Sequence, residues 1–390
     1  MARLSMMQAG LVLALIACVQ AERLVFAAFR NLVTARMDPI VSPGLISQHS
    51  HHILGGSNFK PRYDPDGVRK SKCNSFAMTA DKSQYWHPQV FRILENGSYI
   101  GMDTGTRIYY EFYNYGPNGT AMEAFPYDFM MVGGDPARKS RDPDSVEDAS
   151  MAYYCEQVAE DGSRYGWQTF ELPTYPCNLL ITKVFMPNCW NGKKYDPANP
   201  KAHMRYSYDW FDGPRCPKGF EHRVPSILIE SFHFNADVPY HNNKEQYILA
   251  NGDTTGYGLH GDMVNGWERG VLEGILKNCP VGTINVTEPV EQGCPFLEPY
   301  MDYEHWGGCR TENEIPAGPD EEVGWYNGTA RPIDDLPGCN PPWASGPKPT
   351  CAPPQLAKTR GRVKLAPMRG PGLPAQHSLW FKPSPATAYP

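Results

Sequence analysis

Residues 226–234 read Ser-Ile-Leu-Ile-Glu-Ser-Phe-His-Phe, a run dominated by the β-branched and aromatic side chains that pack well on a pleated sheet. Leu179–Phe185 and Arg107–Tyr113 have the same character, and turn residues flank all three runs. Helical spacing of apolar residues is found only in 261–279. The sequence therefore predicts a mainly β chain: a β-sandwich or jelly-roll-like core with long disulfide-stapled loops and few helices.

Composition excludes several classes of protein. The chain has 390 residues, of which 41% are hydrophobic and 20% charged, which argues against a fully disordered chain and a polytopic membrane protein. Its 36 Lys and Arg against 42 Asp and Glu give a formal net charge of −6, whereas nucleic-acid binders usually carry a basic excess. We expect no nucleic-acid partner, and composition gives no indication of the oligomeric state.

The first residues predict export. A basic start, an apolar stretch from Gly10 to Val19 and small residues before Ala21 are typical of a secretory signal peptide over 1–21. No later segment is long and apolar enough to span a membrane. These features predict a secreted protein, extracellular or associated with the cell wall. The sequons at Asn96, Asn118, Asn285 and Asn327 then become expected glycosylation sites.

Cleavage after Ala21 leaves ten of the 11 cysteines, an even number that predicts up to five disulfides in an oxidising compartment. The spacing does not fix the pairing. Near neighbours are plausible partners: Cys177 with Cys189, Cys279 with Cys294, and Cys339 with Cys351.

Changes in residue composition along the sequence divide the chain into four parts. Residues 1–21 are the signal peptide, and residues 22–36 are a leader or propeptide-like segment that could form one short amphipathic helix. Residues 37–310 form a single β-rich domain. Residues 311–390 are a Pro/Gly-rich extended tail that is basic at its end.

Histidines stand out among the candidate functional residues. His49 and His51 point to one face of a strand, because side chains alternate with period two, so both can converge on one atom as a metal site or an acid/base pair requires. A hydrogen-bonded structural pair is the competing interpretation. Further along, a glycine-rich loop carries Asp253 and His260, and Asp262 after it is expected to cap the following helix.

Aromatic residues next to polar ones are candidates for binding sugar rings. Trp86 and Trp190 have faces that could stack on a pyranose, and Tyr257 lies in the glycine-rich loop. His203 follows Trp190 in a third polar segment. For each aromatic residue, burial in the core is an equally good interpretation.

Several motifs in this order resemble a family of secreted fungal proteins described as domain of unknown function nineteen-ninety-six, over roughly residues 37 to 300. The motifs that carry the resemblance are Pro39–Gly44, His49-x-His51 with Gly55–Phe59, Asp81–Trp86, Gly134–Pro136, Cys189–Lys193, Lys201–Met204 and Gly252–Trp267. The family implies an extracellular fungal protein, in some members joined to carbohydrate-associated modules, and implies no reaction. Asn191 stands where members usually have Asp, and His52 falls outside the family's pattern, so neither is assigned to the site.

These observations lead to one main hypothesis. His49, His51, His203, Asp253 and His260 are the expected catalytic residues of one cleft, with Trp86, Trp190 and Tyr257 as its substrate-binding walls. The cleft would bind extracellular polysaccharide or cleave it, as a hydrolase or a lyase.

Two other hypotheses remain open. In the first, His49, His51 and His203 ligate a divalent metal, copper or zinc. In the second, the chain is a non-catalytic structural wall protein or an effector.

Overall fold

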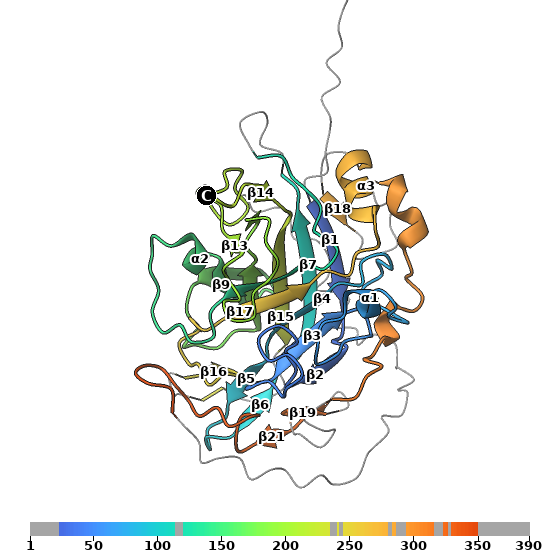
Figure 1. Ribbon diagram of the computed structural model, residues 1–390. Coiled ribbons are helices and arrows are strands. Elements are labelled where there is room, and N and C mark those ends of the chain that lie inside the picture. Colours follow the sequence, from blue (N-terminus) through green and yellow to red (C-terminus); the bar gives the residue numbers. More distant parts are fainter. Residues whose placement is uncertain are drawn as a thin grey trace, which may run out of the picture.

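The computed structural model describes residues 23–113, 120–234, 240–241, 245–279, 283–285, 294–315, 323–326 and 329–349. The predicted signal peptide and residues 350–390 of the expected tail lie outside these ranges. Most regular structure is strand, arranged in several sheets (Figure 1). None of the helices in the described ranges is long and apolar enough to cross a membrane.

The larger of the two main sheets has seven strands, and every pairing in it is antiparallel except that of its last two strands. In spatial order the strands are β10 (Arg164–Thr169), β9 (Met151–Val158), β11 (Leu179–Phe185), β15 (Ser226–Phe234), β7 (Asp103–Glu111), β1 (Arg23–Ala28) and β18 (Thr283–Asn285). The three strands expected from the sequence lie side by side at its centre, β11 and β15 with the predicted bounds.

A five-stranded antiparallel sheet faces it. In spatial order its strands are β2 (Val33–Ala35), β3 (His51–Gly55), β4 (Gln84–Pro88), β17 (His260–Val264) and β8 (Met130–Gly134). Figure 1 shows β17 passing across β15 and β7 rather than alongside them. This sheet carries three of the candidate site residues, His51, Trp86 and His260.

The two sheets pack face to face around one apolar core. Leu54 and Met263 of the smaller sheet belong to the same buried cluster as Ile108 and Ile229 of the larger one. At Gly261 the sheets approach so closely that a Cβ atom would lie 2.9 Å from Val184 and 3.1 Å from Ile229. The predicted mainly β fold with few helices is confirmed, and the strand order does not confirm a jelly-roll connectivity.

Smaller elements surround this core. Short sheets are formed by β16 (Tyr247–Leu249), β5 (Val90–Ile93), β6 (Tyr99–Gly101) and β21 (Pro332–Ile333), by β13 (Met204–Arg205), β12 (Cys189–Trp190) and β14 (His222–Arg223), and by β19 (Trp325–Tyr326) with β20 (Thr329–Ala330). The helices are α1 (Pro65–Val68), α2 (Val146–Ala149), α3 (Val271–Asn278) and the 3₁₀ turns η2 (Pro295–Tyr300) and η3 (Trp306–Gly308).

Four disulfides join the described segments: Cys73–Cys309, Cys155–Cys177, Cys189–Cys216 and Cys279–Cys294. The predicted pair Cys279/Cys294 is confirmed. The pairing of Cys177 with Cys189 is wrong, because the sheets bring each of them to another partner. Cys339 is also disulfide-bonded, and Cys351 lies outside the described residues. Several disulfides fit an extracellular protein.

Two expected helical segments differ from the structure. Residues 22–36 could form one helix by their sequence, but β1 and β2 occupy most of this segment, and β1 lies between β7 and β18 with Leu24 and Phe26 fully buried. A strand that is covered on both faces, such as β1, needs apolar residues at consecutive positions. It therefore lacks the alternation of apolar and polar residues that marks a half-buried strand. Residues 261–279 were also expected as helix, yet β17 takes the first part and α3 begins only at Val271.

Part of the expected extended tail is packed into the fold. Pro332–Ile333 pairs with β6, and Leu336, Asn340 and Trp343 are buried. Gly252, whose φ is +87°, leaves no room for a Cβ atom, which would lie 2.4 Å from the carbonyl oxygen of Pro341. The segment up to Lys348 is therefore part of the domain.

A layer of hydrogen-bonded histidines lies between the two main sheets. His52, His87 and His233 are at most 2% exposed, and their ring centroids are 5.4 to 6.3 Å apart. Hydroxyl groups bond to them: Ser231 Oγ to His87 Nε2 at 2.8 Å, and Thr182 Oγ1 to His233 Nε2 at 3.0 Å. Burial lowers the pKa of all three histidines, that of His87 to about 4. They therefore remain neutral in the folded chain at neutral pH.

This layer makes stability depend on pH. The unfolded chain takes up protons below pH 6.5 and the folded chain does not, so the stability present above pH 6.5 is lost as the pH falls towards 4, by about 3 kcal/mol for His87 alone. We predict that the His233→Gln variant, whose glutamine does not titrate, loses about 2 kcal/mol less of its free energy of unfolding than the parent chain when the pH falls from 7 to 5. Urea unfolding at both pH values measures this loss. An equal loss in the variant and the parent chain would contradict the prediction.

Candidate metal centre

Strand alternation divides the histidines of the smaller sheet between its two faces. Leu54 of β3 and Tyr85 of β4 pack in the core between the sheets, whereas Ile53 and Trp86 belong to a second apolar cluster on the other face. His51 lies on the same side of β3 as Ile53. The histidines on the outer face are thus separated by the sheet from the hydroxyl-bonded layer inside.

The register of the strands brings His51 and His260 close together. His51 pairs with Pro88 of β4, and His260 pairs with Gly134 of β8. Asp262 pairs with Trp86, so the same register continued by two residues places Pro88 opposite His260. Pro88 has a small side chain and Gly134 has none. The imidazole rings of His51 and His260 therefore meet across β4, and their centroids are 5.8 Å apart.

His49 completes the group from the segment just before β3. Its ring centroid lies 4.4 Å from that of His51 and 5.0 Å from that of His260. The Nε2 atoms of His49 and His260 are 3.0 Å apart, and one ring nitrogen of each of the three residues lies within 4.8 Å of the others. The predicted convergence of His49 and His51 is present, with β3 starting only at His51.

Backbone carbonyls fix the orientation of two of the rings. His260 Nδ1 lies 2.8 Å from the Gly258 oxygen, and His51 Nδ1 lies 3.1 Å from the Met37 oxygen. A carbonyl only accepts, so each Nδ1 carries the proton and each Nε2 keeps a lone pair, which in His260 can accept a hydrogen bond from His49 Nε2 at 3.0 Å. His51 Nε2 is buried and has no hydrogen-bond partner among the described residues. Metal-binding histidines typically have this arrangement.

The geometry and charge of the group fit a divalent ion. Two nitrogens bound to one tetrahedral zinc at about 2.0 to 2.1 Å would be about 3.3 Å apart, close to the 3.0 Å between His49 and His260. Burial, as the largest cause, lowers the pKa of all three imidazoles, that of His260 to about 4. They are neutral and available as ligands near neutral pH.

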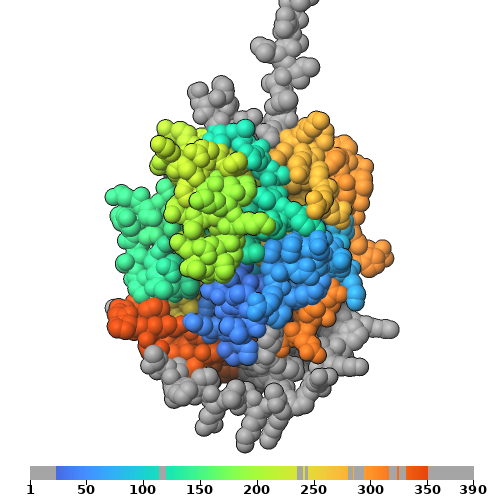
Figure 2. Space-filling view, viewed as in Figure 1, coloured from blue at the N-terminus to red at the C-terminus, as the bar shows by residue number. Residues whose placement is uncertain are grey.

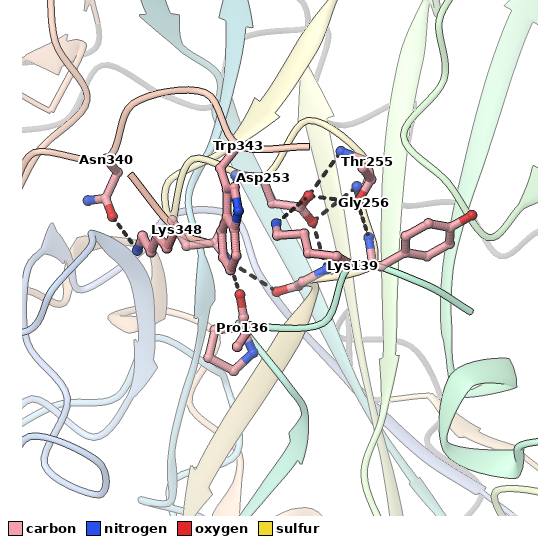
Figure 3. Close-up of polar contacts among 12 residues, drawn as sticks. Pro136, Lys139, Asp253, Thr255, Gly256, Asn340, Trp343 and Lys348 are labelled. Carbon is pink, nitrogen blue, oxygen red and sulfur yellow. Dashed lines mark hydrogen bonds and ion pairs between the residues drawn. The ribbon is translucent and has the colours of Figure 1, made fainter. Parts of the chain in front are cut away.

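Asp253 does not offer a free carboxylate. It is fully buried, and Oδ1 accepts from the Thr255 amide at 3.0 Å and forms an ion pair with Lys139 Nζ at 2.8 Å. Its Oδ2 accepts from the Gly256 and Gly258 amides at 3.1 and 2.6 Å (Figure 3). Through these contacts Asp253 holds the loop whose Gly258 oxygen orients His260, and its expected catalytic role stays a prediction.

His203 lies outside the group. Its Nε2 is 2.8 Å from the Met130 oxygen, and its ring contacts Phe129 and Tyr195. Among the described residues, the ligand set is His49, His51 and His260, not the predicted set with His203. The cleft beside β13, of about 280 Å³ and lined by Lys201 and Tyr206 among others, includes none of these three histidines.

The predicted aromatic walls are also separated. Trp86 is fully buried with its ring centroid 5.4 Å from that of Phe59, so it has no face free for a sugar. Trp190 is half-buried and donates to the Lys193 oxygen at 2.7 Å. Tyr257 is half-buried and donates to Glu171, and burial, aided by this hydrogen bond, raises its pKa to about 12. No single wall forms from the three.

Two further predictions concern the helix cap at Asp262 and the glycosylation sites. Asp262 lies within β17, so the predicted helix-capping role is wrong. Its Oδ2 is buried without a partner among the described residues, and burial together with Asp38 raises its pKa well above the usual range. Asn96 is exposed at a turn, as a glycan acceptor requires. Asn285 is the last residue of β18, and Asn118 and Asn327 lie outside the described residues.

Sequence analysis missed the residues that surround the three histidines. The Met37 and Gly258 carbonyls act through the backbone, which residue types do not reveal. Asn340 donates to the Gln48 oxygen at 2.9 Å across 292 positions of sequence, and it belongs to a segment expected to be solvated. The register of β3, β4 and β17 is the signal that could have linked His51 to His260.

The saturated contacts of Asp253 predict a large effect on stability. Asp253→Ala should lower the free energy of unfolding by about 3 to 5 kcal/mol, because it leaves Lys139 and three loop amides without their acceptor. The control Asp161→Ala, at an exposed turn where Asp161 accepts from the Ser163 amide, should leave the free energy of unfolding close to that of the parent chain. Denaturant unfolding measures both, and near-parental stability of the Asp253 variant would contradict the structural role.

Comparison with known proteins identifies the family. Searches of curated proteins and of solved structures found no match to this chain. A family model described as domain of unknown function (DUF1996) matches residues 38–267, more than half of the chain, and this range includes all three clustered histidines. The chain therefore belongs to the DUF1996 family.

Proposed function

We propose that this chain is a metalloprotein that binds one divalent transition-metal ion through His49, His51 and His260. The observation that carries the proposal is the convergence of three neutral imidazoles, two of them oriented by Nδ1–H donation to a carbonyl, around the unpaired Nε2 of His51. Burying a polar nitrogen without a partner costs free energy, and a metal ion removes that cost.

The donor set favours zinc or copper. Imidazole suits both ions, and three nitrogens without a thiolate or carboxylate do not resemble the oxygen-rich sites of calcium or magnesium. Three protein ligands leave one position open, as in catalytic zinc sites, where the ion acts as a Lewis acid. His49 and His260 are 7% and 6% exposed and His51 is fully buried. A small molecule or a polymer end would therefore approach from the side of His49 and His260.

Binding of Zn²⁺ or Co²⁺ to the full chain tests the proposal. We predict about one ion per chain, and an affinity at least about 100-fold lower in His51→Gln, because even the loss of an outer-shell partner costs 10- to 100-fold. The matched control is His233→Gln, a buried histidine of the inner layer whose nitrogens both face hydroxyls. The metal content of the parent chain and of both variants is measured by mass spectrometry after dialysis. Equal binding by both variants, or none by the parent chain, would refute the site.

A second proposal is that the exported chain binds extracellular polysaccharide at an aromatic surface. Tyr165 and Trp167 on the edge strand β10 are 53% and 43% exposed, with ring centroids 6.3 Å apart. Tyr175 lies 5.4 Å from Trp167 and accepts a hydrogen bond from its indole nitrogen. Exposed aromatic faces with polar edges can pack on the apolar faces of sugar rings. This surface replaces the walls expected at Trp86 and Trp190.

Pull-down on insoluble wall polysaccharides tests the second proposal. We predict that the parent chain is retained by at least one polymer and that Trp167→Ala lowers its affinity about tenfold, which corresponds to losing one buried aromatic contact. Gln168→Ala, on the other face of the same strand, is the matched control and should behave as the parent chain. Failure of the parent chain to bind any polymer would instead favour a structural protein or an effector.

A further inference from the structure

The segment from Gly338 to Lys348, which we call the strap, bonds to the backbone of two segments near the three histidines. The Trp343 amide donates to the Gly252 oxygen at 2.7 Å, and Asn340 Nδ2 donates to the Gln48 oxygen, one residue before His49. Figure 2 shows this part of the chain in orange-red beside the blue N-terminal residues. The strap thus joins the glycine-rich loop on one side and the His49 segment on the other.

Lys348 is linked through one side chain to the segment that carries His49. Its Nζ donates to Asn340 Oδ1 at 2.9 Å, so a single amide group links the ammonium to the backbone next to His49 (Figure 3). The indole of Trp343 lies between two lysines, with its ring centroid 5.9 Å from Lys348 Nζ and 3.8 Å from Lys139 Nζ. The Lys348 charge is one of the causes that lower the pKa of His49.

The two lysines differ in how their charges are compensated. Lys139 forms an ion pair with Asp253, whose oxygens are fully used. Half-buried Lys348 forms no ion pair with a carboxylate in the described part of the chain, and no acidic residue follows Asp335 in the sequence. Burial and the nearby Lys139 lower the pKa of Lys348. A cation so placed is stabilised by an anion supplied from outside.

We propose that Lys348 and the three-histidine centre together bind one carboxylate group, and that the ligand is an acidic sugar residue of a uronate-containing polysaccharide. This inference rests on the proposed metal site. Three neutral imidazoles leave the two positive charges of a divalent ion uncompensated, and Lys348, bonded through Asn340 to the Gln48 oxygen next to His49, adds a third. A carboxylate satisfies both centres at once, with one oxygen for each.

The probe is the full chain loaded with Co²⁺, whose visible absorption reports changes in the ligands around the ion. Galacturonate oligomers are titrated in one arm, and inorganic phosphate and sulfate in two others, which separates a sugar carboxylate from a free oxyanion. Lys348→Gln is compared with Lys277→Gln, an exposed lysine on α3 that gives the same change in net charge. Thermal unfolding and Co²⁺ content of each variant show that fold and metal site are retained.

We expect galacturonate to change the Co²⁺ spectrum of the parent chain and of Lys277→Gln, and Lys348→Gln to bind Co²⁺ fully but galacturonate about tenfold more weakly. Equal galacturonate affinity in Lys348→Gln, or no spectral change with any anion, would overturn this inference and leave the metal site standing. A response to phosphate or sulfate alone would overturn the uronate assignment. A parent chain that binds no Co²⁺ would overturn both the metal site and the inference built on it.

Discussion

The stacking of the five-stranded sheet on the seven-stranded sheet is the constraint from which the candidate site follows. Because side chains alternate along a strand, the packing of Leu54 and Tyr85 into the core assigns a face to every neighbour on β3 and β4. His52 is thereby placed between the sheets and His51 outside. A shift of one residue in register would exchange them, so the register that builds the core also builds the histidine group.

Histidines on the two faces of the five-stranded sheet have different hydrogen-bond partners and therefore different chemical roles. Between the sheets, hydroxyl groups such as those of Ser231 and Thr182 satisfy the ring nitrogens, and the histidines serve as neutral packing groups. On the outer face, carbonyls of Met37 and Gly258 use only Nδ1 and leave Nε2 of His51 and His260 directed towards each other and His49. The difference lies in the partners and not in burial, since His51 and His87 are both buried.

The local patterns in the sequence were informative about strands and about one pair of ligands. The apolar runs at Leu179–Phe185 and Ser226–Phe234 gave correct strands, and period-two spacing correctly placed His49 and His51 together. The sequence alone did not predict which strands pair with each other over long separations. The choice of His260 over His203 depends on which strand lies next to β4, and residue composition does not encode strand order. Asp253 and Trp86 were assigned roles by residue type, but burial and saturated contacts decide what they do.

X-ray absorption at the metal edge of the zinc-loaded chain tests the central claim most directly, because it counts the ligands and measures their distances. We expect one ion per chain with three imidazole nitrogens at about 2.0 to 2.1 Å and one nitrogen lost in His51→Gln. A spectrum dominated by oxygen or sulfur ligands, or one unchanged by the loss of His51, would contradict it.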